Sequence, residues 1–69
     1  MDGNTIRSYC LSVCKEASRL GCRIHVSDWY YVMSFPNGRK ISVNVTGISS
    51  KRVRLWLLCK KFHKEVLAR

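Results

Sequence analysis

Few side chains in this 69-residue sequence can perform acid–base chemistry near neutral pH. His25 and His63 are the only candidate general bases that titrate in this range. The acids are Asp2, Glu16, Asp28 and Glu65. They show no paired spacing of the kind that carboxylate catalysis needs, and the sequence has neither a glycine-rich phosphate loop nor a Gly-x-Ser-x-Gly motif. The sequence therefore predicts no catalytic residues and no enzyme, with a ribonuclease that uses His25 as an alternative.

The cysteines are the other reactive side chains, at Cys10, Cys14, Cys22 and Cys59. Structural zinc sites prefer a Cys-x2-Cys pair, whereas three residues separate Cys10 from Cys14. This spacing puts both thiols on one face of a helix, where a free cysteine packs as a small hydrophobic residue. The N-terminus shows no export signal, so we expect a cytoplasmic protein with reduced, buried thiols and no metal or cofactor. Zinc and a regulatory disulfide remain the alternatives.

The composition is that of one small globular domain with an anionic partner. Hydrophobic residues make up 46% and charged residues 25% of the chain, which is typical of a folded domain over residues 1–69. Such a chain is too short for a Rossmann unit, a barrel or an enclosed active site. Thirteen Lys and Arg against four Asp and Glu give a net charge of +9, which indicates a polyanion such as nucleic acid as the partner. We expect no membrane, because the last helix uses its apolar stripe to cover the sheet, and no small-molecule substrate.

A first amphipathic helix is predicted over residues 5–20. Apolar residues recur there at steps of three and four, at Ile6, Tyr9, Cys10, Val13, Ala17 and Leu20. Asn4 or Thr5 is expected to cap the first turn, and Gly21 to end the helix in a left-handed conformation.

Residues 22–46 change to the alternating pattern of β-strands. Pro36, Asn37 and Gly38 suit a three-residue hairpin loop with a glycine bulge, which sets Phe35 opposite Arg39. This register pairs Met33 with Ile41, Tyr31 with Val43 and Trp29 with Val45. A third short strand is expected over residues 23–26.

A second helix is predicted from residue 51 to the end, after serines that can cap it. Its inner stripe consists of Leu55, Leu58, Cys59, Phe62 and Val66. The predicted fold is thus α+β, in the order α-β-β-β-α, with a two- or three-stranded antiparallel sheet and both helices on one of its faces.

Seven of the thirteen basic residues lie in this last segment, and Glu65 is its only acid. These basic residues could simply keep one face of the helix in solvent. Cations beside a helix N-terminus, however, also form a site that binds phosphate. The predicted nucleic-acid contacts are Lys51, Arg52, Arg54, Lys60, Lys61 and Lys64, with Arg39 and Lys40 of the hairpin loop as a second arm.

The last helix also carries an apolar edge outside its core stripe, made of Trp56, Val53 and Leu67. Either Trp56 packs at the margin of the sheet, or this edge is an interface with a protein partner or a second copy.

Part of this sequence resembles the HicA toxins. The resemblance begins at Leu20-Gly21, continues through a strand and Phe35-Pro36-Asn37-Gly38-Arg39-Lys40-Ile41-Ser42-Val43, and ends in a lysine-rich helix. That family has a fold similar to the double-stranded RNA-binding domain. Its members cleave messenger RNA with the histidine of a Gly-Ser-His segment. The corresponding residues are Asp28-Trp29-Tyr30, so the resemblance implies the fold and a nucleic-acid partner without the ribonuclease histidine, and Tyr30 either stacks on a base or packs.

We therefore expect a small non-catalytic nucleic-acid-binding module that contacts RNA or DNA mainly through phosphates, of the kind found among accessory proteins of phages and mobile elements. The alternative is an interaction or inhibitor module that binds a host protein through the basic helix and the edge around Trp56.

Overall fold

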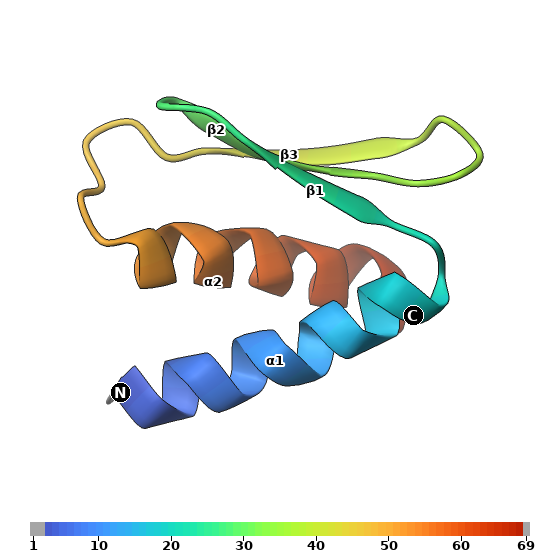
Figure 1. Cartoon of the computed structure of the whole chain (residues 1–69), viewed down its shortest axis with the longest axis horizontal. Coiled ribbons are helices and arrows are strands. Elements are labelled where there is room, and N and C mark those ends of the chain that lie inside the picture. Colours follow the sequence, from blue (N-terminus) through green and yellow to red (C-terminus); the bar gives the residue numbers. More distant parts are fainter. Residues whose placement is uncertain (1–2, 69) are drawn as a thin grey trace.

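Residues 3–68 are described by a computed structural model that has the predicted α-β-β-β-α order. Asp2 lies outside these residues. The elements are α1 (Gly3–Arg19), β1 (Arg23–Val26), β2 (Tyr30–Ser34), β3 (Lys40–Asn44), α2 (Lys51–Phe62) and a π-helical turn, η1 (His63–Leu67). The strands form one antiparallel sheet in the order β1-β2-β3. Both helices lie on the same side of it (Figure 1), which confirms the predicted fold class and the third strand.

α1 begins two residues earlier than predicted, so Asn4 and Thr5 lie within the helix and the expectation that one of them caps it is wrong. Gly3, Asn4 and Thr5 are not apolar, so no hydrophobic periodicity marks the first turn of this helix in the sequence. The end of α1 is as expected. Gly21 has a φ of +78°, and the Cys22 N–H donates to the Ala17 carbonyl at 3.0 Å, as in a Schellman motif.

The hairpin between β2 and β3 has the predicted bulged turn. The Phe35 N–H donates to the Arg39 carbonyl at 2.8 Å, and the Gly38 N–H donates back to the Phe35 carbonyl at 3.0 Å. Gly38 adopts a φ of +90°, and the Asn37 side-chain oxygen accepts the Arg39 N–H. The turn thereby sets the predicted register, in which Met33 faces Ile41.

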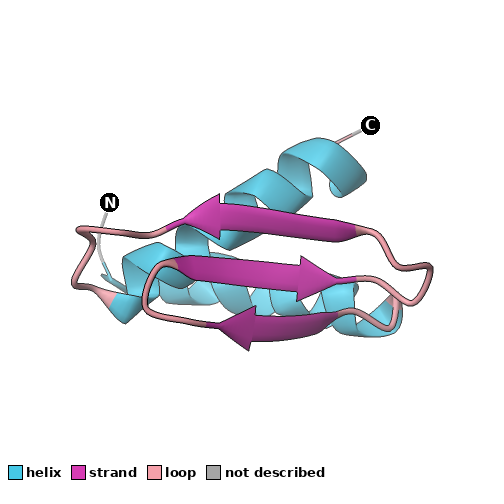
Figure 2. Ribbon diagram, turned by 90° about the horizontal axis from the view of Figure 1, so that it is seen from above, coloured by secondary structure: helices cyan, strands magenta, loops and turns pink. Residues whose placement is uncertain are grey.

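The same register extends to both ends of the hairpin. Tyr31 lies opposite Val43, and the Val45 N–H donates to the Trp29 carbonyl at 2.7 Å. Figure 2 shows the three strands side by side with the helices behind them.

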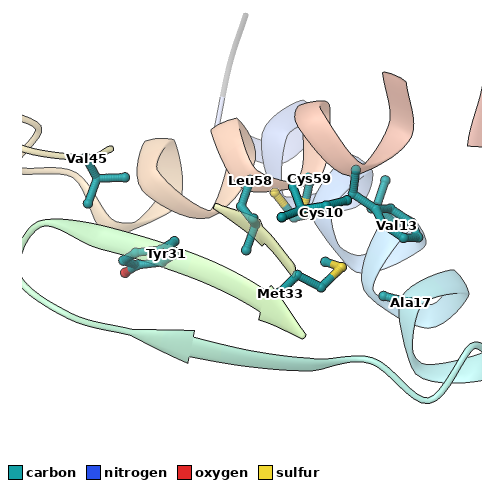
Figure 3. Close-up of a cluster of buried hydrophobic side chains, with 10 residues drawn as sticks. Cys10, Val13, Ala17, Tyr31, Met33, Val45, Leu58 and Cys59 are labelled. Atoms are coloured by element: carbon teal, nitrogen blue, oxygen red, sulfur yellow. The ribbon is translucent and has the colours of Figure 1, made fainter. Parts of the chain in front are cut away.

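The core lies between the sheet and the two helices (Figure 3). α2 packs against β2 and β3, and α1 packs against α2. The buried side chains are Cys10, Val13, Ala17, Tyr31, Met33, Ile41, Val45, Leu58, Cys59 and Phe62. Leu55 and Val66 pack against this cluster while partly exposed, so the predicted inner stripe of the last helix is confirmed.

α2 starts at a serine cap and ends in a wider turn. The Ser50 hydroxyl accepts the Val53 N–H at 3.3 Å. At the other end the Ala68 N–H donates to the His63 carbonyl at 2.8 Å, five residues back, which makes the last turn π-helical. The helical segment therefore continues through Leu67, as the sequence predicts, but with a local change of period.

Candidate nucleic-acid interface

Four of the predicted contact residues are exposed lysines whose side chains form neither an ion pair nor a hydrogen bond within residues 3–68. They are Lys40, Lys51, Lys60 and Lys64. Lys51 opens α2, whose first turn contains no acid, and Lys60 and Lys64 follow one another at a spacing of four residues. Positive charge on this part of the helix is therefore available to an external anion.

Arg52 is also exposed but belongs to a different surface. It lines a groove of about 210 Å³ between α1 and α2, together with Arg7, Leu11 and Leu55. The structure thus places Arg52 on the α1 side of the helix, one turn before Trp56.

Arg54 and Lys61 bind the chain itself. The Arg54 Nε donates to the Ile48 carbonyl in the loop that leads into α2, and this side chain is half-buried. The Lys61 Nζ donates to the Ser42 carbonyl of β3 at 2.7 Å. A helical wheel places both residues opposite the core stripe, but it cannot show which carbonyls of a neighbouring strand or loop need a donor. Lys61 stays exposed, so its other N–H groups can still meet a ligand.

The hairpin loop is tied to the C-terminal turn by an ion pair. The Arg39 guanidinium lies 3.4 Å from the Glu65 carboxylate and stacks over the Phe35 ring at 5.7 Å from its centroid. Both ion-pair partners are more than a third exposed, so the pair contributes well under about 1 kcal/mol to stability. Arg39 thus has an acidic neighbour, whereas the adjacent Lys40 forms no ion pair with any acid among residues 3–68.

Trp56 lies toward α1 rather than at the margin of the sheet. It is half-buried against the core and lines a second groove, of about 200 Å³, with Thr5, Tyr9 and Lys60. The Lys60 Nζ lies 4.7 Å from the centroid of the Trp56 ring. Val53 is half-buried, and Leu67 in η1 is 37% exposed.

A contact at the edge of this groove had no signal in the sequence. The Tyr9 hydroxyl lies 3.0 Å from His63 Nδ1, and the two rings are tilted against each other at 5.9 Å. Burial of the Tyr9 hydroxyl raises its pKa above the usual 10.0. This pair joins the first and last helices across 54 positions of sequence, which local periodicity cannot reveal.

The strand residues that the sequence singled out lie on the open face of the sheet. His25 is exposed and sits opposite Val32, on the side away from Ile24 and Val26. Tyr30 is 47% exposed and sits opposite Asn44. Both can therefore meet a partner that approaches the side without helices.

The thiols form part of the core or its margin. Cys10 and Cys59 are buried, and Cys14 and Cys22 are half-buried. Burial raises the pKa of the Cys59 thiol strongly, and neighbouring cysteine thiols raise it further. Within residues 3–68, no group of three or more His, Cys, Asp or Glu side chains is arranged to hold a metal ion.

Comparison with known proteins adds no assignment. No protein-family model matches this chain, and it has no significant match to a curated protein or to a solved structure. None of the helices within residues 3–68 combines the length and the apolar character needed to cross a bilayer.

Proposed function

We propose that this protein binds nucleic acid without cleaving it, through phosphate contacts made by α2 and the β2–β3 hairpin loop. The observation that carries the proposal is the unneutralised charge. The net charge is +9, and only two ion pairs form in the described part of the chain, Arg19–Glu16 and Arg39–Glu65. A surface with so many uncompensated cations attracts a polyanion.

The proposed contact set starts with the exposed lysines. Lys51, Lys60 and Lys64 of the last helical segment and Lys40 of the hairpin would make the main phosphate contacts. Arg39, Arg52 and Lys61 would add to them from the flanks, while Arg54 positions the loop before α2 through its bond to Ile48. Such contacts hold the backbone and do not read bases, so we expect little sequence preference.

The first experiment is a salt titration of binding by fluorescence anisotropy. Labelled single- and double-stranded RNA and DNA are titrated with the protein between 50 and 300 mM salt. Four to six phosphate contacts on a duplex predict a log–log slope of roughly −4 to −5. A slope near zero on all four nucleic acids would refute the proposal.

Charge variants then locate the interface. Lys60→Ala combined with Lys64→Ala is expected to weaken binding at least tenfold and to reduce the slope by about 2. The matched control is Lys15→Ala combined with Arg23→Ala, which removes the same charge from exposed positions on α1 and β1. Equal losses in the two pairs would mean that overall charge, and not this helix face, determines binding.

One observation favours a second candidate, a protein-binding module. Trp56 and Lys60 form a partly apolar groove with Tyr9, and tryptophan is common at the energetic centre of protein interfaces. Binding of a protein partner there would change little with salt and would weaken on Trp56→Phe. Nucleic-acid binding through phosphates would instead weaken with salt and change little on Trp56→Phe.

A further inference from the structure

The strand β1 forms an edge of the sheet that the helices leave uncovered. All four of its residues are exposed. Ile24 and Val26 pair with Met33 and Tyr31 and so share the helix-facing side of the sheet with them. Met33 is 0% and Tyr31 is 8% exposed, but Ile24 is 37% and Val26 is 64% exposed. The apolar face of the sheet thus continues onto β1, whereas α2 packs beneath β2 and β3.

The main chain of β1 is open along the same edge. The Ser27 N–H donates to the Tyr30 carbonyl at 2.9 Å, which identifies the hydrogen-bonded positions of the β1–β2 ladder. In an antiparallel ladder these positions alternate, so the register directs the bonds of His25 and Arg23 toward β2. The N–H and C=O groups of Ile24 and Val26 therefore point away from the sheet.

The opposite edge differs, because a side chain occupies it. The Ser42 carbonyl on the outer edge of β3 accepts the Lys61 Nζ at 2.7 Å. A lysine over an edge strand is a common protection against pairing with another chain. On β1 the residues with outward main-chain groups are the apolar Ile24 and Val26. The β1 edge is therefore more available to a further strand than the β3 edge.

More apolar surface is exposed on α1 and in the turn that follows β1. Figure 1 shows α1 rising toward its C-terminal end, from which a short loop leads into β1. Leu11 of α1 is 58% exposed and lines the groove of about 210 Å³ with Ile6, Cys14 and Leu55. Trp29, in the turn between β1 and β2, is 60% exposed. Exposed side chains of this size mark interaction surfaces when they occur together.

The charge around β1 identifies the kind of occupant. Arg23 and His25 alternate with Ile24 and Val26 and project to the other side of the sheet. The strands β1, β2 and β3 contain no acidic residue, and Arg7 and Arg52 line the groove between α1 and α2. A second copy would bring another net charge of +9 against this surface, whereas an acidic segment complements it.

We propose that β1 accepts an additional strand from an acidic protein partner, in which apolar and acidic residues alternate. The main chain of that strand would bond to the Ile24 and Val26 N–H and C=O groups. Its apolar side chains would extend the helix-facing side beside Ile24 and Val26, and its acids would pair with Arg23 on the other side. This surface is separate from the lysines proposed to bind nucleic acid.

The test uses the full chain, labelled with ¹⁵N, and the synthetic peptide Ac-Glu-Val-Asp-Ile-Glu-Val-Glu-NH₂. At saturating peptide, exchange of the Ile24 and Val26 amide protons is expected to slow at least tenfold. The Ser42 and Asn44 amides, on the β3 edge, serve as internal controls and should change less than twofold. The same peptide with lysine in place of every acid is expected to bind at least tenfold more weakly.

Two variants distinguish strand addition from general attraction of charge. Arg23→Glu is expected to lower the affinity for the acidic peptide at least tenfold and to raise the affinity for the lysine peptide. Lys60→Ala combined with Lys64→Ala should leave the affinity for the acidic peptide within threefold, even if it abolishes nucleic-acid binding. Arg23 is exposed, so its replacement should not prevent folding, which the amide spectrum checks.

Three results would overturn the proposal. One is unchanged exchange at Ile24 and Val26 with the acidic peptide at millimolar concentration. Another is equal binding of the acidic and lysine peptides. The third is protection of these two amides in the free protein that grows with protein concentration, together with a dimer in sedimentation, because a second copy would then occupy the edge.

Discussion

The Lys61 side chain joins α2 to the outer edge of β3 by donating from Nζ to the Ser42 carbonyl at 2.7 Å. This bond satisfies a main-chain acceptor that no strand covers, and it holds the basic helix beneath the hairpin. The charge of Lys61 and its place opposite the core stripe predict a phosphate contact, but its position in the fold gives it a structural role as well. The same lysine can therefore affect stability and binding, and the two effects need separate measurements.

Replacement of Lys61 by methionine removes this bond while keeping most of the apolar length of the side chain. We expect a loss of about 0.5 to 1 kcal/mol in the free energy of unfolding, because the bond is exposed and its net contribution is modest. Urea denaturation of Lys61→Met measures this. Lys15→Met, at an exposed position of α1, is the matched control and should change stability by less than about 0.5 kcal/mol. Equal stability of the two variants would show that the bond contributes nothing.

Gly21 permits the chain to turn from α1 into β1, and an alanine there should destabilise the protein for two reasons. Its φ of +78° disfavours any side chain, and a Cβ would lie 2.9 Å from Pro36 Cγ. Gly47→Ala is a control with a similar φ, +82°, and no atom within 4 Å of the added Cβ. We expect about 1 kcal/mol of destabilisation for Gly47→Ala and about 1 kcal/mol more for Gly21→Ala, measured by urea denaturation. Equal losses would mean that Pro36 moves aside without cost.

The turns and the core were predictable from sequence because each depends on residues close together in the chain. Pro36, Asn37 and Gly38 specify the bulged turn, and this turn then determines which residues face Met33 and Tyr31. The stripe of Leu58, Cys59 and Phe62 follows from helical periodicity alone. These features are local, so one sequence is sufficient to infer them.

The candidate site was less predictable because it depends on which cations meet other parts of the fold. The sequence shows only basic residues at predicted surface positions for Arg54, Lys61 and Arg39. In the structure they bind a loop carbonyl, a strand carbonyl and Glu65, respectively. The uncovered edge of β1 likewise depends on how far α2 extends beneath the sheet, which no spacing of residues encodes.

Stability should fall in alkaline solution because of the buried thiol of Cys59. Burial raises the pKa of this thiol in the folded protein well above its ordinary value of 9.0. The unfolded chain then releases the proton as the pH rises past about 9, while the folded protein retains it. The stabilisation is thus complete below pH 9 and is lost as the pH rises from there toward the folded pKa.

The measurement is urea denaturation between pH 8 and 10.5 under reducing conditions. We expect stability to decline by about 1 kcal/mol per pH unit above pH 9 because of this one group. Cys59→Ala costs stability at every pH, but its pH profile should be flatter than that of the parent. Parallel profiles would contradict the assignment of the slope to Cys59.

The ion pair between Arg39 and Glu65 leads to a prediction that rests on the proposed function. Glu65→Gln removes the acid 3.4 Å from the Arg39 guanidinium and leaves that cation for a phosphate. We expect a two- to fivefold gain in affinity for duplex nucleic acid and a salt slope steeper by about 0.9, as one more phosphate contact requires. Stability should fall by less than about 1 kcal/mol because the pair is largely exposed.

Glu16→Gln is the matched control, because Glu16 also pairs with an arginine, Arg19, at 3.1 Å, but on α1. Both variants raise the net charge by one, so any difference between them reports the position of the freed arginine and not the total charge. Glu16→Gln is expected to change the affinity by less than twofold and to leave the salt slope unaltered. An equal gain in both variants would show that the hairpin arginine makes no contact of its own, so that Lys40 would be the one hairpin residue left in the proposed contact set.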